Sequence, residues 1–321
     1  MTENKINILC SIDDNYVPFC GIMLTSLFET NLKENFEVYL FTEKLKDENI
    51  KMLQRMITDY GNHLNICYID ENVVKNFPIK GSDHVSLATY YRLFAPALLP
   101  KDVDKVIYLD CDMIVNGSIS ALWNEDVSEY ALRAVDDESG NEISKFNRLN
   151  YPAQRGYFCA GMLLINLDYW RKHNVMERCL QYISDFPERL LFHDQDVLNA
   201  VLNEEKGALP LKYNFQTAFL YNYGRDAFSS VINGEIIKTI SESPAIIHYT
   251  GPYKPWFPHS NHPYANYFLY YKKISYWNKL LPKYKVSIKG EVRRILNSII
   301  WILGIKPRPR TYIIPKQKFR V

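Results

Sequence analysis

Two aspartates separated by one residue close a buried, strand-like segment of this chain. Residues 105–109 (KVIYL) are apolar, and Asp110-Cys111-Asp112 follows them directly. Because alternate residues of an extended backbone share a face, both carboxylates can point at one spot. Two hard oxygen ligands suit Mg²⁺ or Mn²⁺ bridged to substrate phosphates. Turn aspartates are also common, but two unpaired carboxylates after a buried strand would repel each other, which favours a metal site.

The first strand-like segment, residues 6–12, ends in a second polar group, Asp13-Asp14-Asn15-Tyr16. One interpretation is a turn in which Asp and Asn side chains satisfy local backbone groups. The other is nucleotide recognition, with a carboxylate accepting from a uracil N–H and a tyrosine ring stacked on the base. Neither G-x-G-x-x-G nor a P-loop motif occurs, which excludes the usual dinucleotide fold and a P-loop ATPase.

A third group lies late in the chain, where His248 closes a strand-like segment and Gly251 and Lys254 follow. A lone histidine at a strand end is more often structural. The histidine, a glycine that allows close backbone approach and the lysine together could grip a metal-bound diphosphate. Asp194-Gln195-Asp196 opens a helical stretch, where acidic residues also favour the helix start, and Arg92 could be a solvated helix residue.

The elements that must position these residues alternate between strand and helix. Five short apolar segments read as buried parallel strands: residues 6–12, 36–42, 64–69, 105–109 and 131–135. Helical patterns separate them at residues 18–29, 47–60 and 86–98, the last with a Ser86 cap. Such alternation predicts an α/β fold with a mostly parallel central sheet, whose ligands bind outside the carboxyl ends of the strands.

The middle of the chain is less regular. Residues 136–156 are expected to form a long polar loop, and residues 158–167 (FCAGMLLINL) a strand. Helices are expected at 168–185 and 194–203, and a further strand at 245–250.

Seven motifs in order resemble those of family 8 glycosyltransferases, the retaining group that includes bacterial lipopolysaccharide galactosyl- and glucosyltransferases and glycogenin. The motifs are DDNY (13–16), TYYRL (89–93), VIYLDCD (106–112), LW (122–123), FCAGMLLINL (158–167), HDQDVLN (193–199) and HYTGPYKPW (248–256). The resemblance spans residues 6–256. It implies a single Rossmann-like catalytic domain of the GT-A type, here residues 1–282.

The resemblance also implies a ligand for each motif. The cofactor would be Mn²⁺ (or Mg²⁺) and the donor a UDP-sugar, usually UDP-glucose or UDP-galactose. By position, the metal ligands would be Asp110, Asp112 and His248. The uridine contacts would be Ser11, Asp13, Asn15 and Tyr16, and the diphosphate contacts Gly251 and Lys254.

The donor sugar would be oriented by Arg92, Asp194 and Gln195, with Gln195 at the reacting face. Asp194 and Gln195 are therefore the expected catalytic residues. Cys111, Cys159 and Ala160 complete the expected donor contacts, and His84 matches a lid over the donor. Cys159 stands where the family commonly has Asn, which weakens any inference about the sugar.

The resulting expectation is a metal-dependent retaining hexosyltransferase that acts on a lipopolysaccharide or another glycan or lipid-linked acceptor. Two alternatives stay open. One is a non-catalytic carbohydrate-binding protein on the same fold, which would not need both carboxylates of the D-x-D pair. The other is a UDP-sugar phosphohydrolase, which would share the metal site but need no acceptor groove.

Composition and charge set the expected location. The 321 residues are 47% hydrophobic and 23% charged with a net charge of +2, which is ordinary for a globular protein and argues against nucleic-acid binding. The six cysteines are scattered without a C-x-x-C pair, which favours free thiols in a reducing compartment. We therefore expect a cytoplasmic protein.

Residues 283–321 differ from the rest of the chain. They carry eleven Lys and Arg against Glu291, a net of +10, which leaves 2 − 10 = −8 for residues 1–282. Apolar residues recur there at helical spacing: Ile288, Val292, Ile295, Leu296, Ile299, Ile300 and Leu303. This pattern predicts a basic amphipathic helix on an anionic membrane surface, at the inner face of the cell membrane. The alternative is a helix docked on the protein's own core.

Overall fold

The structure is a computed structural model that describes most of the chain. The described residues are 5–79, 86–138, 140, 142–222, 239–251, 254–257, 260, 262–279, 292, 295–297, 299–300, 302–305 and 310–311. His84, the expected lid residue, lies outside them.

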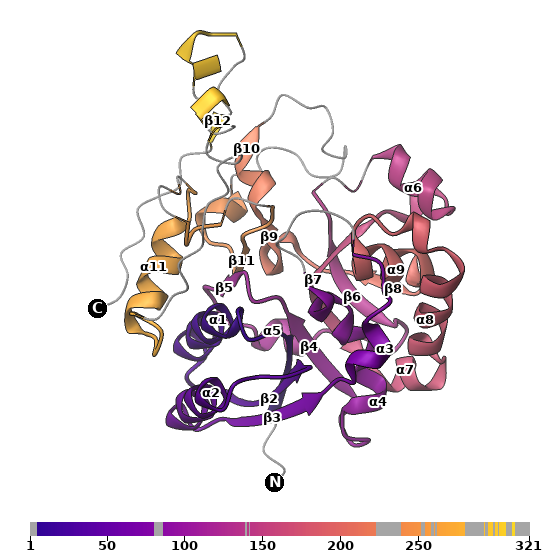
Figure 1. Cartoon of the computed structure of the whole chain (residues 1–321), viewed down its shortest axis with the longest axis horizontal. Helices are drawn as coiled ribbons and strands as arrows, with labels where there is room; N and C mark the ends of the chain where they lie inside the picture. The colour runs from indigo at the N-terminus through magenta and orange to yellow at the C-terminus, as the bar shows by residue number, and fades with distance from the viewer. Residues whose placement is uncertain are drawn as a thin grey trace.

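A seven-stranded sheet forms the centre of the molecule, in the order β3-β2-β1-β4-β7-β6-β8 (Figure 1). The strands are β1 (Lys5–Ser11), β2 (Asn35–Thr42), β3 (His63–Tyr68), β4 (Lys105–Leu109), β6 (Leu132–Asp136), β7 (Phe158–Asn166) and β8 (Lys206–Ala208). All of these strands share one direction except β7, which is antiparallel to β4 and β6. The expected α/β class with a mostly parallel sheet is confirmed.

Helices cover both faces of this sheet. They are α1 (Val17–Thr30), α2 (Asp47–Asp59), α3 (Glu71–Val74), α4 (Ala95–Leu98), α5 (Ser120–Trp123), α6 (Ile143–Leu149), α7 (Leu167–Lys172), α8 (Val175–Asp185), α9 (His193–Leu202) and α11 (Ala265–Ile274). Short 3₁₀ helices lie between these elements: η1 (Leu87–Phe94), η2 (Ala153–Arg155), η3 (Pro187–Arg189), η4 (Leu211–Tyr213) and η5 (Thr217–Leu220).

Alternation along the strands divides the interior into two cores. On β4, Ile107 and Leu109 join the core beneath α1, α2 and α11, whereas Val106 and Tyr108 join the core beneath η1, α4, α7, α8 and α9. Figure 1 shows α1 and α2 on one side of the sheet and α7 to α9 on the other. Because successive strand side chains point to opposite faces, the fully apolar strands of the sequence serve both cores.

Three expected elements differ in detail. The helix expected at 86–98 is the 3₁₀ segment η1 followed by α4, because Pro96 lacks an N–H and is tolerated only in the first turn of a new helix. Ser86 precedes η1 but makes no side-chain capping hydrogen bond. The helix expected at 168–185 breaks at Asn174, which is left-handed at φ 49°, and the expected loop 136–156 contains α6.

A second, three-stranded sheet connects the late part of the chain to the D-x-D segment. It consists of β5 (Met113–Val115), β11 (Ile246–His248) and β9 (Phe215–Gln216), with β11 in the middle. His248 is in register with Met113 on one side and with Gln216 on the other. This register places the end of β11 beside the residues that follow β4.

The described parts of the tail are helical between 292 and 302 and then form β12 (Arg310–Thr311). β12 pairs antiparallel with β10 (Tyr221–Asn222), away from the central sheet in Figure 1. Large apolar side chains of the tail are exposed, namely Val292, Ile295, Leu296, Ile299, Ile302, Leu303 and Ile305. Within the described residues, every helix is too short or too polar to cross a bilayer.

The core beneath α1 depends on a close contact with Trp277, which follows α11 and is 1% exposed. A Cβ atom added to Gly21 of α1 would lie 1.9 Å from the Trp277 ring. The glycine is therefore required by the indole, and packing extends along the chain at least to Trp277.

We expect Trp277→Ala to lower the free energy of unfolding by about 3–5 kcal/mol, because it empties a large buried site. Gly21→Ala should cost about 1–3 kcal/mol through overpacking. Urea unfolding of the single and double variants measures both values. The alanine at position 21 should cost less once the indole is gone, and additive losses would contradict this contact.

Candidate active site

Asp110, Asp112 and His248 meet at the carboxyl end of β4. One potential ligand atom from each residue lies within 4.8 Å of the others. The backbone holds the group from two sides, because the Asp110 N–H donates to Gly161 O at 2.8 Å and the Tyr249 N–H donates to Asp112 O at 2.9 Å. The structure thus brings together the three residues that the family resemblance implied as metal ligands.

The surroundings of this group fit a divalent cation. Two carboxylates and an imidazole are common ligands of Mn²⁺ and related ions. A Cβ atom at Gly161 would lie 2.4 Å from His248 Cε1 and 2.8 Å from Asp110 Oδ2, so only glycine allows these groups to approach. Nearby, the buried Ser11 Oγ has no hydrogen-bond partner among the described residues, as expected of a group that faces a ligand.

Asp112 is paired rather than free. Lys254 Nζ lies 2.6 Å from its Oδ2, and His248 Nε2 lies 3.2 Å from its Oδ1. Burial alone would raise the pKa of Asp112, but the Lys254 and His248 charges hold it well below its usual range. Burial alone would lower the pKa of His248, but the Asp112 charge raises it to about 10. Lys254, expected at the diphosphate, therefore lies beside Asp112, one of the predicted metal ligands.

Arg92 is buried, with 3% of its side chain exposed, and it connects two parts of the site. Its guanidinium lies 2.9 Å from Asp110 Oδ1 and 2.9 Å from Asp194 Oδ2. It also stacks on the Tyr108 ring at 3.8 Å and donates to Ala160 O. Burial raises the pKa of Asp194 to about 6 in spite of the opposing Arg92 charge. The alternative of a solvated helix residue is therefore wrong for Arg92, and its expected contact with the donor sugar stays a prediction.

These pairs correct one premise taken from the sequence. Asp110 and Asp112 do not repel each other as unpaired carboxylates, because each has a cation of its own, Arg92 for Asp110 and Lys254 with His248 for Asp112. The D-x-D segment is thus charge-compensated before any ligand binds.

The carboxamide of Gln195 is fixed in orientation. Its Oε1 accepts the Ala160 N–H at 2.9 Å, and its Nε2 donates to Asp137 Oδ2 at 3.2 Å. Asp137 in turn pairs with the buried Lys145 at 3.0 Å. The sequence analysis missed Asp137 and Lys145, although Asp137 follows the end of β6, where polar residues of a parallel sheet meet the site.

Asp196, the second aspartate of the D-Q-D motif, has a structural role. It is fully buried, pairs with Arg148 at 2.7 Å, and accepts the backbone N–H groups of Leu191 and Phe192 at 2.8 and 2.7 Å. These bonds hold the segment before α9, whose first residue, His193, is left-handed at φ 53°. Asp196 therefore sets the path of the backbone that presents Asp194 and Gln195.

At the expected nucleotide end, the turn interpretation is observed. Asp13 Oδ1 accepts the N–H groups of Asn15 and Tyr16 at 2.9 and 3.1 Å, a local turn at the start of α1. This bonding uses one oxygen of Asp13 and leaves its role toward a base as a prediction, together with those of Asn15 and Tyr16. Gly251, expected at the diphosphate, has φ 79°, which only glycine adopts readily.

Cysteine thiols lie in and beneath the site without disulfides. All six cysteines are free, as expected. Cys111 is buried between the two aspartates, and Cys159 Sγ lies 3.7 Å from His248 Nδ1. Cys159 thus contacts the imidazole of the expected metal ligand, and its expected contact with the donor sugar stays a prediction.

Glu138 is a further carboxyl group that the sequence analysis missed. It follows Asp137, accepts the Ala218 N–H at 3.1 Å, and its own N–H donates to Gln216 Oε1 at 2.9 Å. Burial and the adjacent Asp137 charge raise its pKa to about 7.

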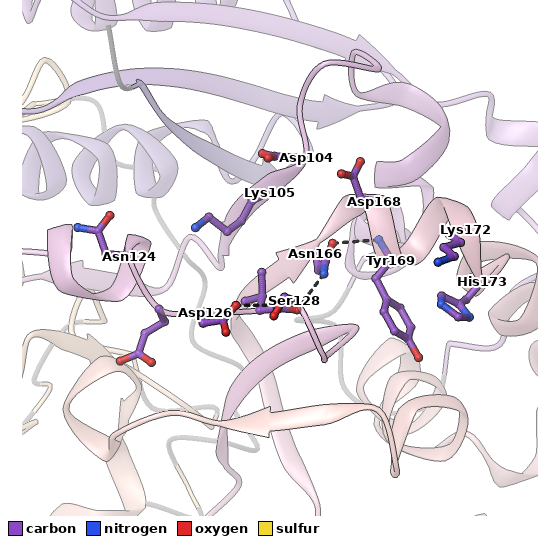
Figure 2. A pocket seen from close by; sticks show the side chains of 12 residues that line it. Asp104, Lys105, Asn124, Asp126, Ser128, Asn166, Asp168, Tyr169, Lys172 and His173 are labelled. Atoms are coloured by element: carbon purple, nitrogen blue, oxygen red, sulfur yellow. Dashed lines mark hydrogen bonds between the residues drawn. The ribbon is translucent and has the colours of Figure 1, made fainter. Parts of the chain in front are cut away.

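An open groove of about 700 Å³ lies elsewhere, at the opposite end of β4. Figure 2 shows Lys105, Asn166 and Tyr169 among the side chains that line it. Lys105 begins β4 and Asp110 follows its end. This groove and the cluster of Asp110, Asp112 and His248 therefore lie at opposite ends of the strand. It contains none of the predicted site residues.

The fold is of the GT-A type found in glycosyltransferases. The family model for glycosyl transferase family 8 matches residues 7–259. The chain belongs to this family.

Two relatives and one solved structure are similar to this chain. General stress protein A of Bacillus subtilis (strain 168) is 31% identical over 283 residues, 87% of this chain and 96% of that protein. The lipopolysaccharide 1,3-galactosyltransferase of Salmonella typhimurium is 30% identical over 281 residues, 86% and 80%. The galactosyltransferase LgtC, solved with donor and acceptor sugar analogs, has a TM-score of 0.74 at 23% identity, covering 87% of this chain and 98% of LgtC.

Replacing Asp112 should weaken ligand binding and also lower the stability of the ligand-free protein. Asp112→Asn removes a charged group from the predicted metal ligands, so the rise in melting temperature expected with Mn²⁺ plus UDP should shrink, and sugar transfer should fall by orders of magnitude. Without ligand, the variant should lose about 3–5 kcal/mol, because Lys254 and His248 lose their partner. Thermal shifts with and without Mn²⁺ and UDP measure both effects. Full sugar transfer by this variant, at the Mn²⁺ concentration that the wild type needs, would contradict the assignment of Asp112 as a metal ligand.

Glu138 should make stability depend on pH. Its raised pKa means that the folded state binds the proton more tightly than the unfolded state, so ionisation above about pH 7 is destabilising. As pH falls from about 8 to about 5, the wild type should gain about 1–3 kcal/mol relative to Glu138→Gln, which does not titrate there. Urea unfolding across this range tests the difference, and parallel pH profiles would contradict it.

Proposed function

We propose that this glycosyltransferase transfers a hexose, glucose or galactose, from a UDP-sugar to a lipopolysaccharide-type or other glycan or lipid-linked acceptor. Transfer retains the anomeric configuration and requires Mn²⁺ or Mg²⁺. The observation that carries the proposal is the convergence of Asp110, Asp112 and His248 beside a fixed Gln195. The relatives named as lipopolysaccharide 1,3-galactosyltransferase and 1,2-glucosyltransferase support the donor and acceptor classes.

A divalent cation, when bound, would neutralise charge on the departing diphosphate. Asp110, Asp112 and His248 would hold it, with Lys254 and Gly251 next to the diphosphate. Asp194 and Asp137 place carboxylate charge near Gln195, where an oxocarbenium-like sugar needs stabilisation.

Retention is proposed to follow same-face attack by the acceptor hydroxyl. A neutral amide is a poor nucleophile, and Gln195 Oε1 already accepts the Ala160 N–H, which withdraws electron density from it. The fixed carboxamide is better suited to orienting the sugar than to forming a covalent bond with it.

The test is incubation with UDP-glucose or UDP-galactose, with and without Mn²⁺, and with a panel of lipopolysaccharide-core and lipid-linked acceptors. Acceptor-dependent release of UDP with glycosylated product supports the proposal. Release of UMP and sugar phosphate would indicate a phosphohydrolase, and binding without turnover would indicate a carbohydrate-binding protein. Hydrolysis of each donor without acceptor gives the preferred sugar independently.

The tail is proposed to hold the enzyme at the inner face of the cell membrane, beside a lipid-linked acceptor. Its support is the net +10 charge of residues 283–321 combined with the exposed apolar side chains between Val292 and Ile305. Apolar burial and attraction to anionic lipids act together in such helices, each basic residue adding about 1 kcal/mol at low salt.

Removing residues 283–321 should therefore abolish salt-sensitive binding to anionic liposomes while donor hydrolysis in solution persists. Leu296→Glu combined with Ile299→Glu is a milder variant that leaves β12 in place. Liposome co-sedimentation at low and high salt measures the effect. Unfolding of both variants, or liposome binding equal to that of the full chain, would show that the tail is structural.

A further inference from the structure

The two nitrogens of the His248 ring face different groups. Nε2 faces Asp112 Oδ1 at 3.2 Å, on the side where Asp110 also lies. Nδ1 faces Asn214 Oδ1 at 2.9 Å and, farther away, Cys159 Sγ at 3.7 Å. The ring is buried, so these side chains replace water as its partners.

Only one protonation pattern of neutral histidine leaves Nε2 able to bind a cation. A ligand nitrogen needs a free lone pair, so the proton must reside on Nδ1. An amide oxygen accepts hydrogen bonds and donates none, and Asn214 Oδ1 therefore stabilises an Nδ1–H. A thiol sulfur at 3.7 Å is a weaker acceptor and adds little to this preference.

Asn214 is well placed to enforce this choice. It is fully buried between η4 and β9, and its backbone N–H donates to Leu211 O at 3.1 Å. β9 pairs with β11 in fixed register, which places the backbone next to Asn214 beside that of His248. Within the described residues, Asn214 Nδ2 has no hydrogen-bond partner, so the contact of the oxygen with His248 is the polar contact that its side chain makes.

We propose that Asn214 is a positioning residue for the divalent cation. Its amide oxygen keeps the His248 proton on Nδ1 and directs Nε2 toward the cation. The assignment rests on the proposed metal-dependent function and adds to it a residue outside the resembling motifs. The reverse amide orientation would place Nδ2 against the ring, move the proton to Nε2 and block coordination.

Two substitutions separate this role from packing. Asn214→Leu keeps the branching at Cγ and removes the acceptor, and it should weaken Mn²⁺ affinity by about 10- to 100-fold, the usual effect of losing such a partner. Asn214→Asp keeps an acceptor oxygen and should bind Mn²⁺ within about threefold of the wild type or more tightly. Mn²⁺ titration followed by electron paramagnetic resonance of the free ion, with UDP present, measures affinity without turnover.

Asn62→Leu is the matched control. Asn62 is also buried, and its Oδ1 accepts the Phe36 N–H at 2.8 Å at the far edge of the sheet. This variant should lose stability and keep its Mn²⁺ affinity within about twofold, because it lies outside the ligand set. Asn214→Ala serves in place of the leucine variant if that variant does not fold.

The outcomes distinguish the inference from the function on which it rests. Equal Mn²⁺ affinity in the wild type and Asn214→Leu overturns the role of Asn214 alone. Equally weak binding by the leucine and aspartate variants also overturns it, since the aspartate restores the acceptor. Failure of the wild type to bind Mn²⁺ with UDP overturns the metal-dependent function together with the inference.

Discussion

The buried guanidinium of Arg92 holds Asp110 and Asp194 at a fixed separation, and both ends of the site depend on it. Asp110 belongs to the proposed metal ligands, and Asp194 belongs to the segment that presents Gln195. Removing either partner of a buried ion pair leaves an uncompensated charge, which costs several kcal/mol. The guanidinium of Arg92 is itself held in place by its contacts with the Tyr108 ring and the Ala160 carbonyl. The arginine therefore acts on the site through the carboxylates that it orients.

The antiparallel direction of β7 serves the same geometry. Because β7 runs opposite to β4, its first residues lie at the carboxyl end of β4, beside Asp110. Ala160 and Gly161 can then supply backbone groups to Gln195, Arg92 and Asp110. A parallel β7 would bring its last residues to that edge instead.

The fold class and the D-x-D pair could be predicted because their signals are local, whereas His248 was placed with that pair only by the family resemblance. Buried strands are apolar runs, and the D-x-D pair follows one of them directly. Strand direction, by contrast, leaves no local trace in residues 158–167, and the 3₁₀ character of η1 depends on how Pro96 begins the next turn. Asp137 and Asn214 were missed because their partners, Gln195 and His248, are distant in sequence and meet them only in the folded chain. Lys145 was missed together with Asp137, its own partner.

Charge balance couples the binding of the cation and the nucleotide at this site. Asp110, Asp112 and Asp194 are offset by Arg92, Lys254 and a protonated His248, so the ligand-free group is close to neutral. A divalent cation alone would bring positive charge next to Lys254 and would have to displace the His248 proton, which weakens its binding. The diphosphate of a UDP-sugar carries an opposite charge of similar size, so the two ligands together add almost no net charge. Cation and nucleotide should therefore each strengthen the binding of the other, as linkage requires of any such coupling.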